Sequence, residues 1–204
     1  MDLKTQILKI KGTWQDVVDD CRNTVSKPPL GKEPSKEFKR NILISEHSPI
    51  RDISIRWKWE AIKSWISVHW VRHKWECFVS TQRTDRTGVN RDNLPQSTLL
   101  DFVGDANIQQ LIDTMRKRLC FQASKETREY AEDFKSELHK YEPEIADVLV
   151  PNCVYRCGCP ECTGENKCKA FENLLVNMQL KDVNVFNIQE RYDAYNEWFY
   201  STHK

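Results

Sequence analysis

The stretch RDISIRWKWEAI (residues 51–62) decides the fold, because hydrophobic and polar residues alternate along it. An alternation with a period of two is typical of a β-strand that buries one face. The residues expected on the buried face are Ile53, Ile55, Trp57 and Trp59. The next segment, KSWISVHWVRH (63–73), has the pattern of a short amphipathic helix and delivers Arg72 and His73 at its C-terminal end. The pattern therefore predicts a half-buried strand followed at once by a helix that ends in cationic residues.

The segments on either side add a short strand and several helices. QILKIKG (6–12) predicts an opening strand, and Thr13 is placed to cap a helix over residues 13–25. The prolines of Ser26–Phe38 predict a loop, and the polar stretch Asp85–Gln96 predicts a connector. Hydrophobic residues at helical spacing predict further helices, over residues 105–121, 124–141, 169–180 and 187–204. This order indicates an α+β fold, in which a small antiparallel or mixed sheet is packed by several helices.

Length and charge limit the domain organisation and the class of partner. The 204 residues fit one domain over residues 1–150, with a cysteine-rich segment and C-terminal helices over residues 151–204 packed on it. The formal net charge is only +1, so an anion site needs a local cluster of cations, and nucleic acid is not an expected partner. The sequence shows neither a signal peptide nor an apolar run of roughly 18 residues, which predicts a cytoplasmic protein without a membrane partner.

The segment WVRHKWECFVSTQRTDR (70–86) is such a local cluster. It mixes arginines, a lysine and a histidine with aromatic and hydroxyl residues, directly after the predicted helix. A guanidinium group binds two phosphate oxygens at once, so clustered arginines favour a phosphorylated ligand. Aromatic residues among cations are also typical of proteins that bind single-stranded nucleic acids, but the near-zero net charge weakens that alternative.

Four stretches in the same order resemble the flavin-dependent thymidylate synthases. SEHSPIRDISIRWKW (45–59) is similar to the family segment in which His and Ser lead into an alternating strand, and WVRHKWECFVSTQR (70–83) is similar to its Arg-His-Arg signature. RDNLP (91–95) is similar to Arg-x-x-Leu-Pro, and residues 107–129 resemble the family helix with Asn at its start and Arg eleven residues later. The chain departs from the family where Asp52 replaces a histidine, Lys74 the third basic residue and Gln82 the serine. Almost no insert separates the second and third stretches, a compact form that suits a divergent viral member.

The resemblance implies a flavoprotein enzyme of the methyltransferase class. Such an enzyme transfers a one-carbon unit from methylenetetrahydrofolate to C5 of dUMP, with a hydride from reduced FAD and with NADPH as the reductant. It needs no cysteine nucleophile, and it builds its active sites from several subunits of a homotetramer. Two alternatives stay open. One is the same scaffold performing another modification, such as 5-hydroxymethylation of dUMP or dCMP, and the other is a catalytically silent relative that binds nucleotides.

The resemblance also assigns roles to individual residues. Cofactor binding falls to His47, Ser48, Arg72, His73, Lys74 and Asn107. Nucleotide binding falls to Arg72, Gln82, Arg83, Arg91 and Arg118. Arg118 is expected beside the uracil as the catalytic residue, because a cation there stabilises the charge that develops when C5 acts as a nucleophile. The structural alternatives are an ordinary helix cap for Asn107, a core imidazole for His47 and salt bridges for the arginines.

The segment CVYRCGCPECTGENKC (153–168) carries five of the eight cysteines. Cys159 and Cys162 have the spacing of half a zinc site, and in a reducing compartment a metal is favoured over a disulfide. The expected ligands of a structural zinc are Cys157, Cys159, Cys162 and Cys168. Four thiolates would leave the metal no open position for catalysis. Unligated thiols and a redox or disulfide role remain the alternatives.

Overall fold

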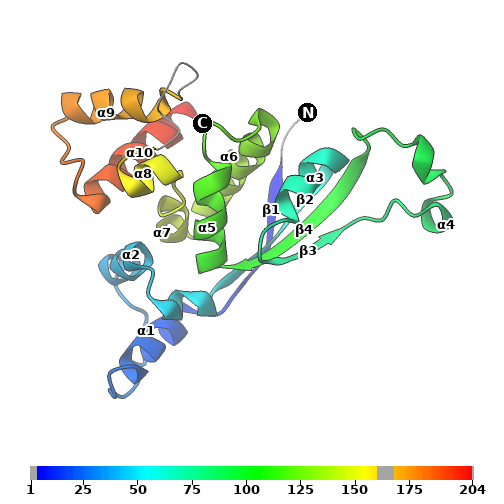
Figure 1. Ribbon diagram of the computed structural model, residues 1–204. Coiled ribbons are helices and arrows are strands. Elements are labelled where there is room, and N and C mark those ends of the chain that lie inside the picture. The colour runs from blue at the N-terminus through cyan, green and yellow to red at the C-terminus, as the bar shows by residue number, and fades with distance from the viewer. Residues whose placement is uncertain (1–3, 160–167, 204) are drawn as a thin grey trace.

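The computed structural model describes residues 4–159 and 168–203. Four strands form one sheet in the order β1-β2-β4-β3, and every neighbouring pair is antiparallel (Figure 1). The strands are β1 (Thr5–Lys11), β2 (Ser54–Lys63), β3 (Glu76–Val79) and β4 (Leu99–Asn107). The predicted α+β class is therefore confirmed, and the sheet is antiparallel throughout.

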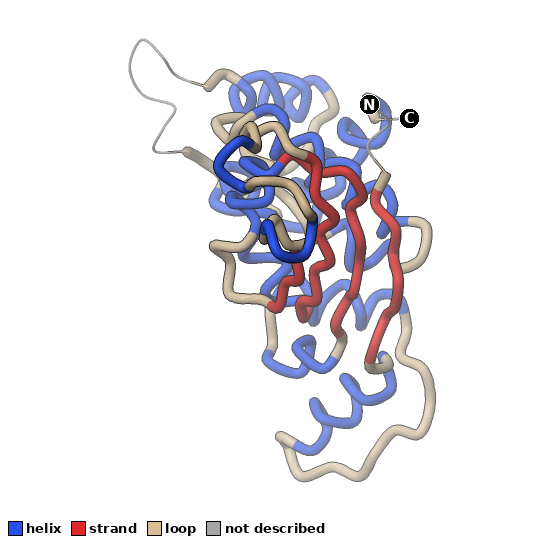
Figure 2. Tube along the Cα trace, turned by 90° about the vertical axis from the view of Figure 1, so that its right-hand side faces the viewer, coloured by secondary structure: helices blue, strands red, loops and turns tan. Residues whose placement is uncertain are grey.

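Helices cover one face of this sheet, and in Figure 2 the four strands lie in front of most of them. The N-terminal helices are α1 (Trp14–Asn23), α2 (Lys36–Ser45), the 3₁₀ turn η1 (Ser48–Asp52) and α3 (Ser64–Trp70). The helices after the sheet are α5 (Ile108–Arg118), α6 (Lys125–His139), α7 (Pro143–Asp147), α8 (Asn152–Arg156), α9 (Ala170–Leu180) and α10 (Ile188–Thr202). Between Val79 and Leu99 the chain leaves the body as an arm, which carries α4 (Thr84–Thr87) and η2 (Arg91–Asn93).

The two faces of β2 differ as its alternation predicts. Ile55, Trp57 and Trp59 are fully buried, whereas Arg56 and Lys58 on the other face pair with Asp105 and Asp101 of β4. The buried rings pack edge to face, with 4.9 Å between the ring centroids of Trp57 and Phe134 of α6. Helices therefore bury the aromatic face, and ion pairs across the strands keep the opposite face polar.

The edge strand β1 depends on a helix far away in the sequence. The backbone N–H and the hydroxyl of Thr5 both donate to Asp133 of α6, at 2.6 and 2.5 Å. Trp14, at the start of α1, donates from Nε1 to Glu142 at 2.9 Å. Each contact joins residues 128 positions apart, so the N-terminal segment is held in place by the second half of the chain.

Two predicted boundaries were wrong, and one predicted connector contains short helical turns. Residues 105–107 belong to β4, and α5 begins at Ile108 because Asn107 and Gln110 form a capping box. The loop predicted over Ser26–Phe38 ends early, because Ser35 caps α2. The connector predicted over Asp85–Gln96 contains α4 and η2.

The helices after Val150 join the same hydrophobic core as the rest of the chain. Val154, Phe171, Tyr195 and Phe199 are all buried in it. Within the described ranges, no helix combines the length and the apolar character needed to cross a bilayer.

Candidate functional site

The turn after α3 displays cations because its two ends are buried. Trp70 and Trp75 stack with 5.9 Å between their ring centroids, and Trp75 Nε1 donates to the Trp70 carbonyl oxygen at 3.0 Å. This contact closes the intervening residues into a tight turn. Arg72 and Lys74 are exposed on it, and His73 is half-buried. The buried tryptophans thus project the predicted phosphate-binding residues outward.

Helix α5 lies against this turn and orders it. Gln110 donates from Nε2 to the carbonyl oxygen of Lys74. At the other end of the helix, Arg118 donates from Nε to His73 Nε2 at 2.8 Å and from a terminal nitrogen to the His69 carbonyl oxygen at 2.8 Å. Gln110 and Arg118, near the two ends of α5, therefore both contact the short segment from His69 to Lys74.

On its other side α5 contacts the end of α2 and the short helix α8. Arg116 is 8% exposed and pairs with Glu46, which has the left-handed φ of 52° at the C-cap of α2. Gln109 Nε2 also donates to Glu46, at 2.7 Å. The Arg116 guanidinium carbon lies 3.5 Å from the ring centroid of Tyr155 in α8. These contacts fix the end of α2 and helix α8 along the flank of α5 opposite the 72–74 turn.

A cleft of about 650 Å³ lies over α5 between these two flanks. One flank contributes Arg72, His73 and Lys74, and the other contributes Arg51 of η1 and Tyr155 and Arg156 of α8. Gln110 and Lys117 line it from α5 itself, and Asn107 lines it as the N-cap of that helix. Asp113 is the one carboxylate among the lining residues, and it lies 3.6 Å from Arg116. The cleft is therefore strongly basic in a chain of almost neutral charge.

The arginines of this cleft lack partners. Among the arginines of residues 4–159 and 168–203, four have a guanidinium group without an ion pair, a hydrogen bond or a ring contact, namely Arg51, Arg72, Arg91 and Arg156. Three of the four line the cleft. Guanidinium groups gathered without acceptors are available to an anionic ligand.

His73 is neutral at physiological pH. Burial first, and then the charges of Arg118 and Lys117, lower its pKa to about 4. Because Arg118 donates to Nε2, the ring proton resides on Nδ1. Burial and the nearby charge of Arg72 also lower the pKa of Arg118, which stays charged because an arginine is not deprotonated in proteins. The pair offers one cation and one neutral donor beside the cleft.

Two predicted cofactor residues lie elsewhere in the single chain. His47 and Ser48 line a separate hollow of about 400 Å³, together with Cys21 and Phe38. The 3₁₀ turn η1 runs from that hollow to the cleft, because Ser48 begins it and Arg51 lies within it. His47 is exposed, so it is not a core imidazole.

The arm carries three of the predicted nucleotide-binding residues. Gln82, Arg83 and Arg91 lie between β3 and β4, and Figure 1 shows this segment extending away from the helices. Arg83 makes two hydrogen bonds to Asp85, at 3.0 and 2.8 Å. None of the three lines the cleft of its own chain.

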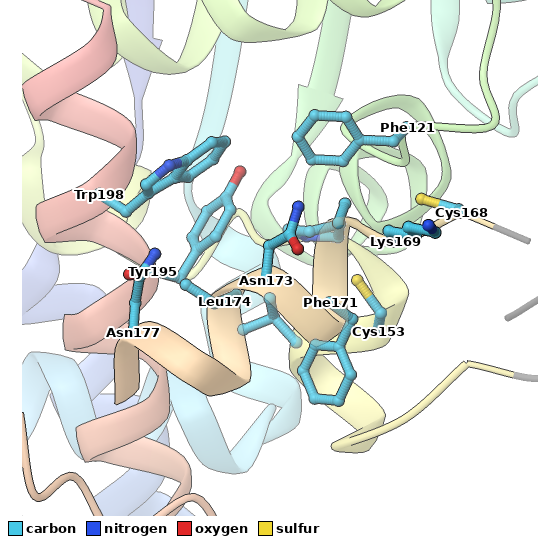
Figure 3. A pocket seen from close by; sticks show the side chains of 13 residues that line it. Phe121, Cys153, Cys168, Lys169, Phe171, Asn173, Leu174, Asn177, Tyr195 and Trp198 are labelled. Atoms are coloured by element: carbon cyan, nitrogen blue, oxygen red, sulfur yellow. The ribbon is translucent and has the colours of Figure 1, made fainter. Parts of the chain in front are cut away.

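The described cysteines of the 153–168 segment differ in their surroundings. Cys157 ends α8 and its Sγ lies 3.5 Å from the Val185 carbonyl oxygen. Burial first, and then Cys120, Cys159 and Cys168, raise the pKa of the Cys153 thiol to about 12. Figure 3 shows Cys153 and Cys168 at one end of an apolar pocket of about 340 Å³. Cys162 lies outside the described residues, and the described residues contain no group of three potential ligands that could hold a metal. The zinc site remains a prediction.

The sequence did not reveal several residues of the cleft. These are Arg51, Gln109, Gln110, Lys117, Tyr155 and Arg156. Lys117 belongs to a visible basic run at the end of α5, but no local pattern links Arg156 to a turn more than eighty residues earlier. Trp57 and Trp59 are fully buried core residues, as predicted, and Trp70 is fully buried beside them.

Fold and cleft together define an α+β protein with a basic cleft beside a four-stranded antiparallel sheet. The fold is similar to that of PolB, a UMP/dUMP methylase from Streptomyces cacaoi. The structure of PolB bound with 5-Br dUMP has a TM-score of 0.58 and 14% identity, and the match covers 72% of this chain and 94% of that chain. The structure bound with 5-Br UMP has a TM-score of 0.54 and 15% identity, covering 72% and 93%. No protein-family model and no curated protein sequence matches the chain.

Proposed function

We propose that the protein is an enzyme that adds a one-carbon unit to C5 of a pyrimidine nucleotide such as dUMP. The observation that supports this most directly is the gathering of three arginines without partners in one cleft. The similarity in fold to a UMP/dUMP methylase agrees with a nucleotide substrate. We infer the reaction of flavin-dependent thymidylate synthases, with methylenetetrahydrofolate as the carbon donor, FAD as the cofactor and NADPH as the reductant.

The residues present fit a flavin dinucleotide. Arg72 and Lys74 are exposed cations on an ordered turn and would bind its phosphates. His47 and Ser48 would contact the cofactor from the neighbouring hollow that they line. The amide nitrogen of Asn107 remains available, because its oxygen is the atom that caps α5. When bound, reduced FAD supplies the hydride. The protein's own part is to position the ligands and to place charge where the reaction develops it.

Arg118 would supply this positive charge, with its guanidinium group hydrogen-bonded to His73. Its two hydrogen bonds, to His73 and to the His69 carbonyl, hold the guanidinium group in one orientation. Replacing it by methionine keeps the unbranched apolar part of the side chain and removes the cation. We expect Arg118→Met to lower kcat by about 10²–10³ while the folded structure is retained. Unchanged turnover in the correctly folded variant would contradict this role.

The site as proposed needs more than one subunit. Gln82, Arg83 and Arg91 are the predicted nucleotide-binding residues on the arm, and the arm extends away from its own cleft. We infer that in a homotetramer the arm of one subunit reaches the cleft of another. This arrangement would bring Arg91 to the nucleotide that Arg72 and Arg118 approach from the other side.

Two measurements test the proposed function. Purified full-length protein should bind added FAD, and its visible spectrum should change when dUMP is added. Incubation with dUMP, methylenetetrahydrofolate, NADPH and FAD should then give a product 14 mass units heavier than dUMP, the mass of a methyl group that replaces hydrogen. A product 30 mass units heavier would indicate hydroxymethylation instead, and a protein that ignores FAD would overturn both reactions.

A further inference from the structure

Helix α8 is a short element that is fixed from two sides. Arg116 stacks on the ring of Tyr155 from the side of α5, at 3.5 Å. Arg191 of α10 is 4% exposed and donates to the carbonyl oxygens of Val154 and Tyr155 on the other side. Arg191 therefore satisfies carbonyl groups that a helix end leaves without partners. A helix of only five residues is held rigid by two buried arginines.

This support presents Arg156 at a fixed position. Arg156 is the residue after Tyr155, and it is exposed on the wall of the cleft. Arg51 of η1 lies on the same flank, where Glu46 and Arg116 join α2 to α5. Neither guanidinium group has a partner among the described residues. Two exposed cations without partners in one cleft favour the binding of an anionic group.

The cations of the cleft come from separate elements. Arg72 and Lys74 lie on the turn after α3, Arg51 and Arg156 lie on η1 and α8, and Lys117 lies on α5. We propose that Arg156, together with Arg51, binds a second anionic group of the ligands, distinct from the phosphate bound at Arg72 and Lys74. This inference rests on the proposed function of the cleft as a nucleotide site. The second group is a phosphate of the dinucleotide or a carboxylate of the folate, and both are oxyanions that a guanidinium fork binds.

Binding measurements on four proteins test this second anion site. They are the wild type, Arg156→Gln, Arg51→Gln and the control Arg22→Gln. The control removes one positive charge on α1, where Arg22 Nε donates to the Pro28 carbonyl oxygen away from the cleft. The probes are FAD, tetrahydrofolate and inorganic pyrophosphate, with affinities measured by calorimetry at two salt concentrations. Circular dichroism verifies that each variant is folded.

We expect Arg156→Gln and Arg51→Gln to weaken the same organic probe by about tenfold or more, because each loses a charge-assisted hydrogen bond. The other organic probe should change by less than about twofold, and Arg156→Lys should recover part of the loss. The probe that is weakened identifies the source of the anion. Equal losses for all probes, matched by Arg22→Gln, would show a general effect of charge and overturn the inference, as would unchanged affinities.

The same experiment separates this inference from the proposed function. Wild-type protein that binds FAD and forms product, with affinities unaffected by Arg156→Gln, would contradict only the second anion site. Wild-type protein that ignores FAD but binds pyrophosphate tightly, with a loss in Arg156→Gln, would contradict the proposed reaction and support the site.

Discussion

The His73 imidazole combines partial burial with a hydrogen bond from a cation. Burial removes water that would stabilise the charged ring, and Arg118 donates to the nitrogen that a proton would otherwise occupy. Both effects favour the neutral form. The ring therefore does not act as a cation toward a phosphate. Within the Arg72–Lys74 turn, the two exposed side chains supply the charge and His73 supplies a hydrogen-bond donor.

We predict that the pKa of His73 is about 4, measured from its imidazole resonances by NMR as a function of pH. In Arg118→Met the pKa should rise, because one positive charge is lost, yet stay below 6.5, because burial is the larger cause. Between pH 6.5 and about 4 the unfolded chain binds a proton that the fold does not. This histidine therefore lowers the free energy of unfolding as the pH falls through that window. A pKa near 6.5 in the wild type would contradict the geometry.

At the scale of single residues, the sequence predicted one flank of the cleft and missed the other. Arg72, His73, Lys74 and Asn107 gather as the resemblance implied, since a short turn and one helix join them. Arg51 and Arg156 come from elements whose contact depends on the tertiary packing of Arg116 against Tyr155. No periodicity or spacing in the sequence encodes that contact.

Among the elements, β4 meets β2 at Gly104, which pairs with Trp57 and lies against its ring. A Cβ atom there would lie 2.2 Å from Cζ2 of Trp57, whose ring is fully buried between Trp75 and Phe134. The ring cannot move without displacing its neighbours. Strand propensity alone would favour alanine over glycine. For Gly104→Ala, propensity therefore predicts a higher free energy of unfolding, whereas packing predicts a lower one.

We predict that Gly104→Ala lowers the free energy of unfolding by about 3 kcal/mol, measured by urea denaturation. Gly158→Ala is the matched control, because a Cβ atom there meets no atom within 4 Å. The control should change stability by less than about 0.5 kcal/mol. A neutral Gly104→Ala would mean that the tryptophan ring has room to shift.

Lys135 joins α6 to two later helices through a fully buried amine. Its Nζ donates to the Ala146 carbonyl oxygen at 2.6 Å and to Asn196 Oδ1 at 2.8 Å. The ring centroids of Phe199 and Tyr200 lie 5.2 and 5.1 Å away. Burial lowers the pKa of this lysine to about 7, although the nearby Asp147 opposes the shift.

We predict that Lys135 makes the fold more stable as the pH rises from 7 to 10. Over that range the unfolded chain keeps a proton that the folded chain has lost, so the free energy of unfolding increases by roughly 1 kcal/mol per pH unit. The comparison is with Lys135→Met, by chemical denaturation at pH 7, 8 and 9. Subtracting the two curves removes the contribution of other groups. The same pH dependence in the wild type and in Lys135→Met would contradict the prediction, because the amine would then have the same pKa in the folded and unfolded states.

The sequence predicted the short elements β1, α1 and α3, and it predicted most clearly the elements with a long, uninterrupted period. β2, α5, α6, α9 and α10 all satisfy this condition. β4 was missed although Leu100, Phe102 and Ala106 alternate, because Gly104 interrupts the buried face and the last residues also fit the start of the next helix. β3 has only four residues, and its pairing with β4 is set by tertiary contact.

For the whole molecule, the separation of the arm from the cleft predicts shared active sites. If Arg91 serves a neighbouring subunit, Arg72→Ala and Arg91→Ala proteins should each be nearly inactive. Mixing them under conditions that exchange subunits should restore up to about a quarter of wild-type activity, because random pairing of the two site residues gives a quarter of intact sites. Light scattering checks that the mixture is tetrameric. Mixtures that stay inactive would contradict a site that is shared between subunits.

The two long-range contacts of the N-terminal segment also set an order of events during synthesis. Asp133 and Glu142 leave the ribosome 128 residues after Thr5 and Trp14. At the usual rates of translation that delay is roughly ten seconds. During this time β1 lacks its contact with Asp133, and the indole rings of β2 lack the cover of Phe134. Nascent chains arrested before α6 should therefore be retained by chaperones, and release should begin only once that helix has emerged.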